Sequence, residues 1–358
     1  MVEVPVVDMS PLVGGAGGAG GAGGADGADG AEGAEGAGDV SAVAEAIDAA
    51  CRDVGFFTVV GHGVGPELQS RLDHAARRFF ALPDSEKAEI AMARAGRAWR
   101  GWFPVGGELT SGVPDLKEGL YFGAELGPDH PRRRAGTPLH GANLFPRRPP
   151  ELREAVLATM AQMTRLGQAV LGGIAVGLGL DRSWFARQLT ADPVTLFRIF
   201  HYPPAGAGAS ERWGVAEHTD YGLLTILEQD DTGGLQVRTP AGWVDVEPIP
   251  GGFVCNLGDM LERLTGGLYR STPHRVRNAS DGHRLSYPFF LDPGWDAVVD
   301  PLPIVERPPD EDAVAAGRWD HASVHGFAGT YGDYLTAKVA KVFPALAAEA
   351  ADAADAPA

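Results

Sequence analysis

The stretch GVAEHTDYGLLTILEQ, residues 214–229, opens a series of short strand-like runs and carries the chemically most informative residues of the chain. An apolar run with the alternation of a strand follows His218 and Asp220 directly, so we expect this pair to lie on or just before a strand. Residues two apart on a strand point to the same face of a sheet. Both side chains can therefore reach one metal ion.

A third metal ligand and a carboxylate-binding pair follow further along the chain. The segment STPHRVRN supplies His274 at the edge of another β-type run. Two imidazoles and one carboxylate, with coordination positions left open, are the facial arrangement of non-haem iron(II) oxygenases. Arg284 and Ser286 lie two apart in HRLSYPFFLDP. An arginine fork beside a hydroxyl is suited to holding a carboxylate, so we expect iron beside a carboxylate-bearing co-substrate.

The strand-like runs recur throughout residues 214–295, separated by Gly, Pro or Asp. They read LLTILEQ, GLQVR, GWVDVEP, GFVCNLG, HRVRN and RLSYPFFLD. Short strands at regular spacing with turn residues between them predict a sandwich or barrel. Helical patterns elsewhere in the chain, of which residues 150–179 are the longest, predict that helices flank this mainly β core.

Beyond these residues, the chain resembles the isopenicillin N synthase-like iron(II)/2-oxoglutarate dioxygenases. The resemblance is carried by VPVVDMSPL, by AIDAACRDVGFFTVVGHGV and by RRFFALPDSEKAEI, in addition to the histidine, aspartate and arginine motifs. It covers nearly all of the chain outside residues 14–38 and the last dozen positions. It implies a double-stranded β-helix, or jelly roll, as the core.

The resemblance also implies roles for individual residues. His218, Asp220 and His274 would hold Fe(II), and Arg284 with Ser286 would bind the far carboxylate of 2-oxoglutarate. In TLFRIFHYPP, Tyr202 matches a tyrosine that contacts 2-oxoglutarate in plant relatives, whereas phenylalanine at position 200 replaces their asparagine. O2 would be the second co-substrate, and ascorbate is a possible stimulant.

The expected reaction couples decarboxylation of 2-oxoglutarate to hydroxylation of a small organic metabolite, typical of secondary metabolism; desaturation and ring closure are family variants. Two alternatives stay open. The first is an isopenicillin N synthase-like or aminocyclopropanecarboxylate oxidase-like iron oxidase that does not use 2-oxoglutarate, because Arg284 could hold a substrate carboxylate instead. The second is an iron-binding scaffold without catalytic activity, which the complete set of motifs disfavours.

Four regions divide the chain in this interpretation. Residues 1–110 form an N-terminal helix and strand region, in which the Gly-Ala tract 14–38 is a flexible insertion. Residues 111–191 contain a loop system and a long supporting helix. Residues 192–296 form the jelly-roll core that carries the iron site. Residues 297–358 provide a C-terminal segment, a helix and an acidic tail.

Composition narrows the class of partners. The 358 residues include 47 acidic and 30 basic side chains, which gives a formal charge of −17 and argues against nucleic acid or an anionic membrane as a partner. Cys51 and Cys255 are too few for a disulfide framework, and we expect buried thiols. With neither a leader-like pattern nor a long apolar run, we expect a cytoplasmic protein that binds a small-molecule substrate and has no evident obligate protein partner.

Several other polar residues are interpreted as structural. His62 lies in a Gly-His-Gly turn, and His201 points away from the face that carries Tyr202. Asn256 and Asp259, in NLGD, fit the turn into the next segment. The pair of histidines at positions 321 and 325 has zinc-site spacing, but alanine stands where a metalloprotease glutamate would be.

Overall fold

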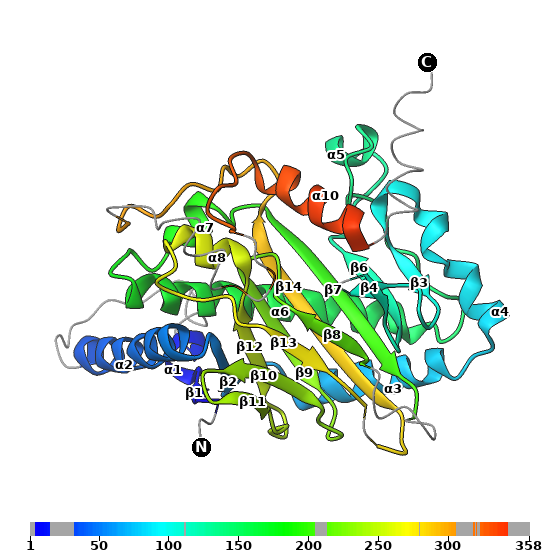
Figure 1. The fold of residues 1–358 in the computed structure, drawn as a ribbon, viewed down its shortest axis with the longest axis horizontal. Coiled ribbons are helices and arrows are strands. Elements are labelled where there is room, and N and C mark those ends of the chain that lie inside the picture. The colour runs from blue at the N-terminus through cyan, green and yellow to red at the C-terminus, as the bar shows by residue number, and fades with distance from the viewer. Residues whose placement is uncertain are drawn as a thin grey trace, which may run out of the picture.

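Two β-sheets form the centre of the protein, with helices packed around them (Figure 1). The computed structural model describes residues 4–14, 32–110, 112–204, 213–278, 280–305, 318, 320 and 323–342, without the side chains of 32–38. The sheets, together with the comparisons given below, confirm the predicted jelly-roll core with flanking helices.

The major sheet has eight strands in the order β1-β2-β12-β9-β14-β7-β6-β3. All its neighbouring strands are antiparallel except the parallel pair β1 and β2. The strands are β1 (Val6–Asp8), β2 (Phe56–Val60), β12 (Phe253–Leu257), β9 (Leu224–Gln229), β14 (Arg284–Gly294), β7 (Pro193–Tyr202), β6 (Glu118–Gly123) and β3 (Gly101–Phe103).

The minor sheet is antiparallel and has the order β11-β10-β13-β8. Its strands are β11 (Gly242–Asp245), β10 (Leu235–Thr239), β13 (His274–Val276) and β8 (Val215–His218). A separate hairpin consists of β4 (Leu109–Thr110) and β5 (Val113–Pro114).

The helices lie outside the sheets. They are α1 (Ser10–Val13), α2 (Glu32–Asp53), α3 (Pro66–Phe80), α4 (Asp84–Lys87), α5 (Pro131–Arg134), α6 (Glu151–Gly177), α7 (Trp184–Gln188), α8 (Asp259–Leu264) and α10 (Tyr331–Val342), with the 3-10 turns η2 (Ala88–Ile90) and η3 (Met92–Ala98).

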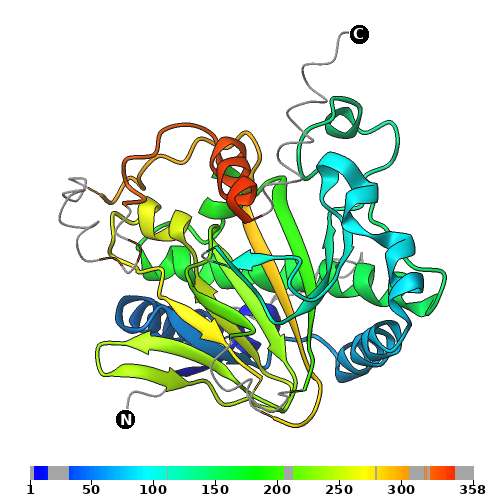
Figure 2. The ribbon, with the colours of Figure 1, turned by 45° about the vertical axis from the view of Figure 1, so that its right-hand side comes forward.

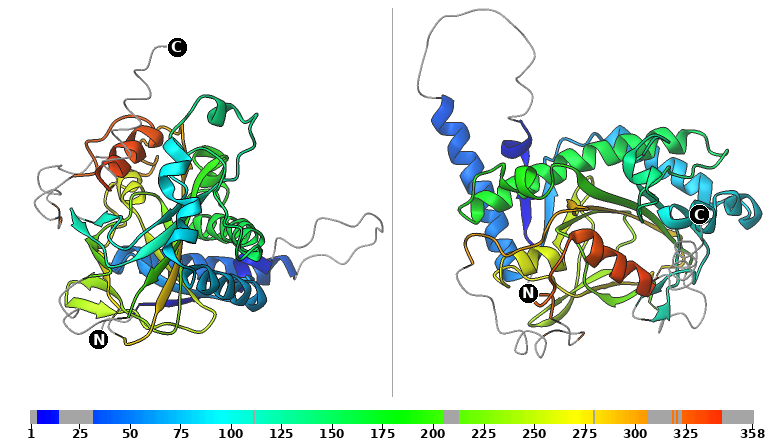
Figure 3. Two further views of the ribbon diagram at one scale, coloured as in Figure 1. Left: turned by 90° about the vertical axis from the view of Figure 1, so that its right-hand side faces the viewer. Right: turned by 90° about the horizontal axis from the view of Figure 1, so that it is seen from above.

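Helix α6 packs across the back of the major sheet, whereas α10 lies on the opposite side of the strands (Figure 3). The approach of α6 is close at Gly167, where an added Cβ would lie 2.7 Å from Cδ2 of Leu291 on β14. The helix agrees with the pattern that predicted it over residues 150–179. With α2 and α3 beside it, α6 covers the back of the sheet (Figure 2). The other face of the sheet lines a cavity.

Strand β7 shows how the sequence period separates these two faces. Leu196, Arg198, Phe200 and Tyr202 all line the cavity. The residues between them point to the opposite face because side chains alternate along a strand, and there His201 stacks on the ring of a phenylalanine in α3, Phe80. The two-residue period in TLFRIFHY therefore sets which side chains reach the cavity.

Two expectations about the N-terminal half need correction. Residues 111–191, expected to contain a loop system and a supporting helix, also contain β6, which belongs to the major sheet. Every residue of β6 is buried, so it lacks the polar and apolar alternation that identifies a half-buried strand. In addition, α2 begins at Glu32, inside the tract expected to be a flexible insertion; residues 15–31 of that tract lie outside the described residues.

Candidate active site

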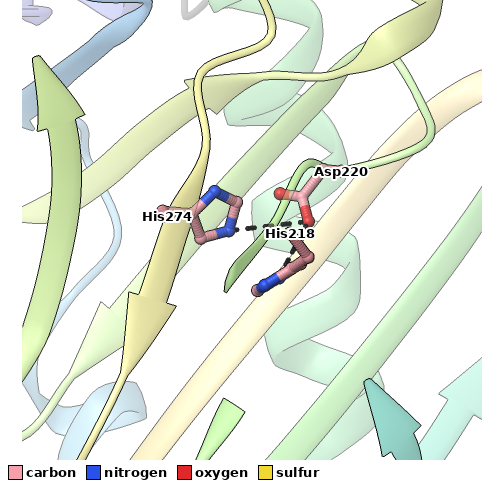
Figure 4. Close-up of side chains that lie close together, drawn as sticks. All are labelled: His218, Asp220 and His274. Atoms are coloured by element: carbon pink, nitrogen blue, oxygen red, sulfur yellow. Dashed lines mark ion pairs between the residues drawn. The ribbon is translucent and has the colours of Figure 1, made fainter. Parts of the chain in front are cut away.

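His218, Asp220 and His274 come together at the end of the minor sheet (Figure 4). His218 is the last residue of β8 and pairs in register with His274, the first residue of β13. The potential ligand atoms of all three residues lie within 4.8 Å of one another. Oδ1 of Asp220 is 3.8 Å from Nε2 of His218 and 3.7 Å from Nε2 of His274. The arrangement therefore offers two nitrogens and one oxygen to a single ion.

Hydrogen bonds at the far side of each imidazole orient these nitrogens. Nδ1 of His218 is 2.8 Å from the carbonyl oxygen of Ala216, and Nδ1 of His274 is 3.2 Å from that of Thr272. A carbonyl can only accept, so each Nδ1 carries the proton. Each Nε2 then keeps a lone pair directed at the common point, as a metal ligand requires.

Two further side chains hold the carboxylate of Asp220. Its Oδ2 accepts hydrogen bonds from Oγ1 of Thr225, at 2.5 Å, and from Nδ2 of Asn256, at 2.7 Å. Thr225 and Asn256 are register partners on β9 and β12 of the major sheet. Oδ1 is thereby left to face the two imidazoles. Side chains of the major sheet therefore orient the carboxylate of Asp220, and the minor sheet carries the two histidines.

The electrostatics of the cluster match the protonation state of a metal site. Burial and the neighbouring imidazole of His274 lower the pKa of His218 to about 4, so this ring is neutral at physiological pH. Burial opposes ionisation of Asp220, but the two imidazoles and the donors Thr225 and Asn256 outweigh it and lower the pKa of the carboxyl. Neutral imidazoles beside an ionised carboxylate are the donor set that a divalent transition metal requires.

Arg284 supplies a second binding element in the same cavity. The residue is fully buried, and its guanidinium lies 4.7 Å from the centre of the Tyr202 ring. Nε donates to the carbonyl oxygen of Gly233, and Nη2 lies 3.4 Å from Oε1 of Gln229. Nη1 is buried and has no hydrogen-bond partner among the described residues. A buried cationic donor without a partner is costly unless a ligand accepts from it.

Ser286 and Tyr202, the two residues predicted to act with Arg284, lie near it in the same cavity. Ser286 is two residues along β14 from Arg284, and its Oγ is 3.4 Å from the hydroxyl of Tyr202. Arg284, Ser286 and Tyr202 all line the cavity, as do the three metal-ligand candidates. The guanidinium and two hydroxyls therefore form one polar patch that fits a carboxylate.

The cavity has a volume of about 430 Å³ and is lined by residues of both sheets and of α10. Helix α10 contributes Leu335 and Val339 to its lining. The helix is tied to β14 by Tyr331, whose hydroxyl donates to Oδ2 of Asp292 at 2.6 Å. Burial raises the pKa of Asp292 to about 7. The C-terminal helix thus forms a wall of the cavity that contains the candidate metal ligands.

Sequence reasoning missed the role of Asn256, which was interpreted as part of a turn. Its side chain instead holds Asp220, as described above. Asp259 is also more than a turn residue, because it forms ion pairs with Arg318 at 3.1 Å and with Lys338 at 3.4 Å. A signal for Asn256 was present in the sequence: a polar amide within the apolar run GFVCNLG needs a buried partner.

His62 and His201, which were interpreted as structural, lie outside the cluster. His62 is hydrogen-bonded to the carbonyl oxygen of Gly251 at 2.6 Å. His201 is hydrogen-bonded to Glu118 at 2.8 Å and to His283 at 2.7 Å, on the helix-packed side of the sheet. Both structural interpretations are confirmed. Position 321 lies outside the described residues, so the possible zinc pair stays undescribed.

Two family models match this chain. The one described as the N-terminal region of the non-haem dioxygenases in morphine synthesis matches residues 4–148, and the 2OG-Fe(II) oxygenase superfamily model matches residues 193–293. The chain belongs to the 2OG-Fe(II) oxygenase superfamily. The resemblance inferred from the sequence is therefore confirmed. Members of this superfamily are enzymes, so the alternative of an iron-binding scaffold without catalytic activity is excluded.

Curated relatives include oxidases and hydroxylases. A probable iron/ascorbate oxidoreductase of Dictyostelium discoideum is 45% identical over 319 residues, which cover 83% of this chain and 88% of the relative. A 1-aminocyclopropane-1-carboxylate oxidase of Dictyostelium mucoroides is 35% identical, covering 84% and 90%. A homoarginine-6-hydroxylase of Arabidopsis thaliana is 38% identical, covering 75% and 82%. These relatives are named for different reactions, so they identify the family of this chain and not its substrate.

A solved structure supports the fold over most of the chain. A 2OG-Fe(II) oxygenase family protein of Caulobacter crescentus is 29% identical with a TM-score of 0.70, covering 85% of this chain and 95% of that chain. The family and the iron/ascorbate name support iron(II), 2-oxoglutarate, O2 and ascorbate as the cofactors and co-substrates. Within the described residues, no helix is long and apolar enough to span a membrane.

Proposed function

We propose that this enzyme couples the oxidative decarboxylation of 2-oxoglutarate to the hydroxylation of a small organic molecule. The balanced reaction consumes 2-oxoglutarate, O2 and a substrate C–H bond, and it yields succinate, CO2 and the alcohol. In this proposal His218, Asp220 and His274 hold Fe(II), while Arg284, Ser286 and Tyr202 bind the far carboxylate of 2-oxoglutarate. The observation that carries the proposal is the unpartnered, buried Nη1 of Arg284 in the cavity of the metal-ligand candidates.

The three metal-ligand candidates fit iron(II) by donor type and by number. Two neutral imidazoles and one carboxylate suit Fe(II), and a facial set of three leaves coordination positions open for a chelating 2-oxo acid and O2. When bound, the metal supplies the activation of O2. Thr225 and Asn256 keep Oδ2 of Asp220 occupied, so that Oδ1 is the atom offered to the metal.

The Arg284 side of the cavity fits one end of a dicarboxylate. Its free Nη1 donates to a carboxylate oxygen, while the hydroxyls of Ser286 and Tyr202 can donate to the other. The ring of Tyr202 covers one face of the guanidinium and keeps its plane fixed. Leu227, Leu235 and Val276 line the same cavity, and their apolar side chains exclude water and strengthen the ion pair.

An oxidase that does not use 2-oxoglutarate is the second candidate, because a relative named 1-aminocyclopropane-1-carboxylate oxidase is 35% identical. Arg284 would then hold a carboxylate of the substrate itself. The two candidates differ in whether 2-oxoglutarate binds the iron-loaded protein and whether succinate is formed.

The deciding experiment loads the protein with Fe(II) under anaerobic conditions, adds 2-oxoglutarate and records the visible spectrum. We expect a metal-to-ligand charge-transfer band, followed by succinate once air is admitted. The variant Arg284→Met is expected to require far more 2-oxoglutarate for the same band. Iron binding with neither band nor succinate would contradict the proposal and favour the oxidase.

A further inference from the structure

A second arginine also lines the cavity. One strand, β14, separates its strand from β9, which carries the Thr225 that is hydrogen-bonded to Asp220. Arg198 lies on β7, on the same face as Tyr202. Its guanidinium carbon is 4.3 Å from the ring centre of Tyr121 and 4.8 Å from that of Phe290. The two rings hold the guanidinium in place, and the polar edge of the group is left to form hydrogen bonds.

Within the described part of the chain, Arg198 does not use all of its hydrogen-bonding capacity. Nε is buried and has no partner among the described residues, and Nη1 is 3.8 Å from Oε1 of Glu108, which is too long for a hydrogen bond. Glu108 has other partners: it accepts a hydrogen bond from the Tyr121 hydroxyl and forms an ion pair with Lys117 at 2.8 Å. The acid nearest to Arg198 therefore balances its charge without satisfying its donors.

Sheet geometry separates Arg198 from the Arg284 patch. Thr225, which holds Asp220, lies on β9, and the order β9-β14-β7 places Arg198 two strands away, about 10 Å across the sheet. Arg284 pairs with Tyr202 on β7, four residues or roughly 13 Å along that strand from Arg198. A co-substrate that runs from the metal to Arg284 leaves Arg198 accessible from the cavity.

We propose that Arg198 binds a carboxylate of the primary substrate, so that this enzyme acts on a small carboxylic acid. The hydroxylation step rests on the function proposed above, whereas the binding of the acid does not. A planar guanidinium that presents one edge matches the two oxygens of a carboxylate. The formal charges of Glu108, Asp115, Lys117 and Arg198 cancel, so donated hydrogen bonds rather than net charge would hold an anion here. A singly charged carboxylate is then favoured over a phosphate dianion, because it loses less hydration on burial.

The test measures binding without turnover. The full chain is loaded with Zn(II) and saturated with 2-oxoglutarate, which occupies the Arg284 patch. Fluoroacetate and fluoroacetamide, which have nearly the same shape and differ in charge, are then titrated separately and followed by fluorine NMR. We expect fluoroacetate to bind at least about 5-fold more tightly than the amide in the wild-type protein, and Arg198→Met to abolish this preference.

Matched variants separate this result from general effects. Arg187→Met makes the same substitution on the exposed helix α7 and should keep the preference. Arg198→Gln keeps a polar but uncharged and shorter side chain and serves if the methionine variant fails to fold, as judged by thermal unfolding. Equal binding of the two probes by the wild type, or a preference that survives in both Arg198 variants, would overturn the proposal. Tighter binding of inorganic phosphate than of fluoroacetate would overturn the carboxylate assignment.

Failure of the proposed function gives a different pattern. If 2-oxoglutarate does not bind, fluoroacetate can also occupy the Arg284 patch, and Arg284→Met will then lower its binding. If the preference for fluoroacetate over fluoroacetamide depends on Arg198 alone, it persists in Arg284→Met. In turnover, carboxylic acids and their primary amides are compared as stimulants of succinate formation, and we expect only the acids to stimulate the wild-type enzyme.

Discussion

The two faces of the major sheet use buried polar groups in opposite ways. On the face covered by helices, His201 is hydrogen-bonded to Glu118, which also accepts from Lys87 and Trp102. On the cavity face, Arg284 and Arg198 each keep a buried nitrogen that has no partner among the described residues. A polar group that the fold itself satisfies stabilises the protein, whereas a donor left without a partner in the wall of a cavity is available to a ligand.

The helix-packed face has an exception that fits the same principle. Oε2 of Glu228 is buried there without a partner among the described residues. Burial and the nearby Asp73 raise the pKa of Glu228 to about 7, so the carboxyl is partly protonated near neutral pH. On this face an unsatisfied acid is thus neutralised by a proton, whereas on the cavity face we expect substrates to accept hydrogen bonds from the unsatisfied donors of the two arginines.

The largest effect is expected from Asp220→Ala, which removes the only carboxylate among the three metal-ligand candidates. We expect iron binding to be lost and turnover to fall by at least about 1,000-fold, because two imidazoles alone do not hold the metal in place. Binding is measured by anaerobic titration with Fe(II), and turnover by succinate. The control Asp300→Ala removes an exposed carboxylate and should change neither. Retained iron binding in Asp220→Ala would show that the site lies elsewhere.

The next effect is expected from Arg284→Met on the cavity face. Loss of the buried cation should raise the KM for 2-oxoglutarate by about 100-fold, as when one partner of a buried charge pair is removed. Arg284→Lys should be intermediate, since it keeps the charge but loses the fork. Arg187→Met on the surface is the control, and an unchanged KM in Arg284→Met would contradict the assignment.

A smaller effect is expected from Asn256→Ala, which acts on the metal through Asp220. Removal of the Nδ2 donor leaves Thr225 as the remaining side chain on Oδ2, so the carboxylate gains freedom to rotate. We expect iron affinity to fall by about 10-fold to 100-fold, with little change in the KM for 2-oxoglutarate. Anaerobic iron titration measures the first and initial rates the second. Equal losses in both would indicate a general defect in folding.

The smallest effect is expected from Glu228→Gln on the helix-packed face. The raised pKa means that the folded state binds more protons than the unfolded state between pH 4.5 and about 7. The stability of the wild type therefore falls as the pH rises through this range, by about 1 kcal/mol for a partly exposed side chain. Gln carries no titratable charge, so its variant should be more stable than the wild type at pH 8 and should lose this advantage at pH 5. Urea unfolding at both pH values measures the difference, and a constant difference would contradict the prediction.

Much of the candidate site could be predicted because its residues occur in short local patterns. His218 and Asp220 are two apart, as are Arg284 and Ser286, and alternation along a strand brings each pair to one face. The alternation in TLFRIFHY likewise predicted that Tyr202 would face one side and His201 the other. Fully buried strands were harder to identify, and β6 was missed because all six of its residues are buried.

By itself, the sequence determined the class of protein, a candidate donor set for a metal and a candidate arginine for binding a carboxylate. These depend on residue type and on spacing along the chain, which strand geometry converts directly into position. Only the tertiary structure decided that Asn256 holds Asp220, that Arg198 faces the cavity with a donor unpartnered among the described residues, and that α10 lines this cavity. Each of these contacts joins residues far apart in the sequence, and the register and order of the strands bring them together.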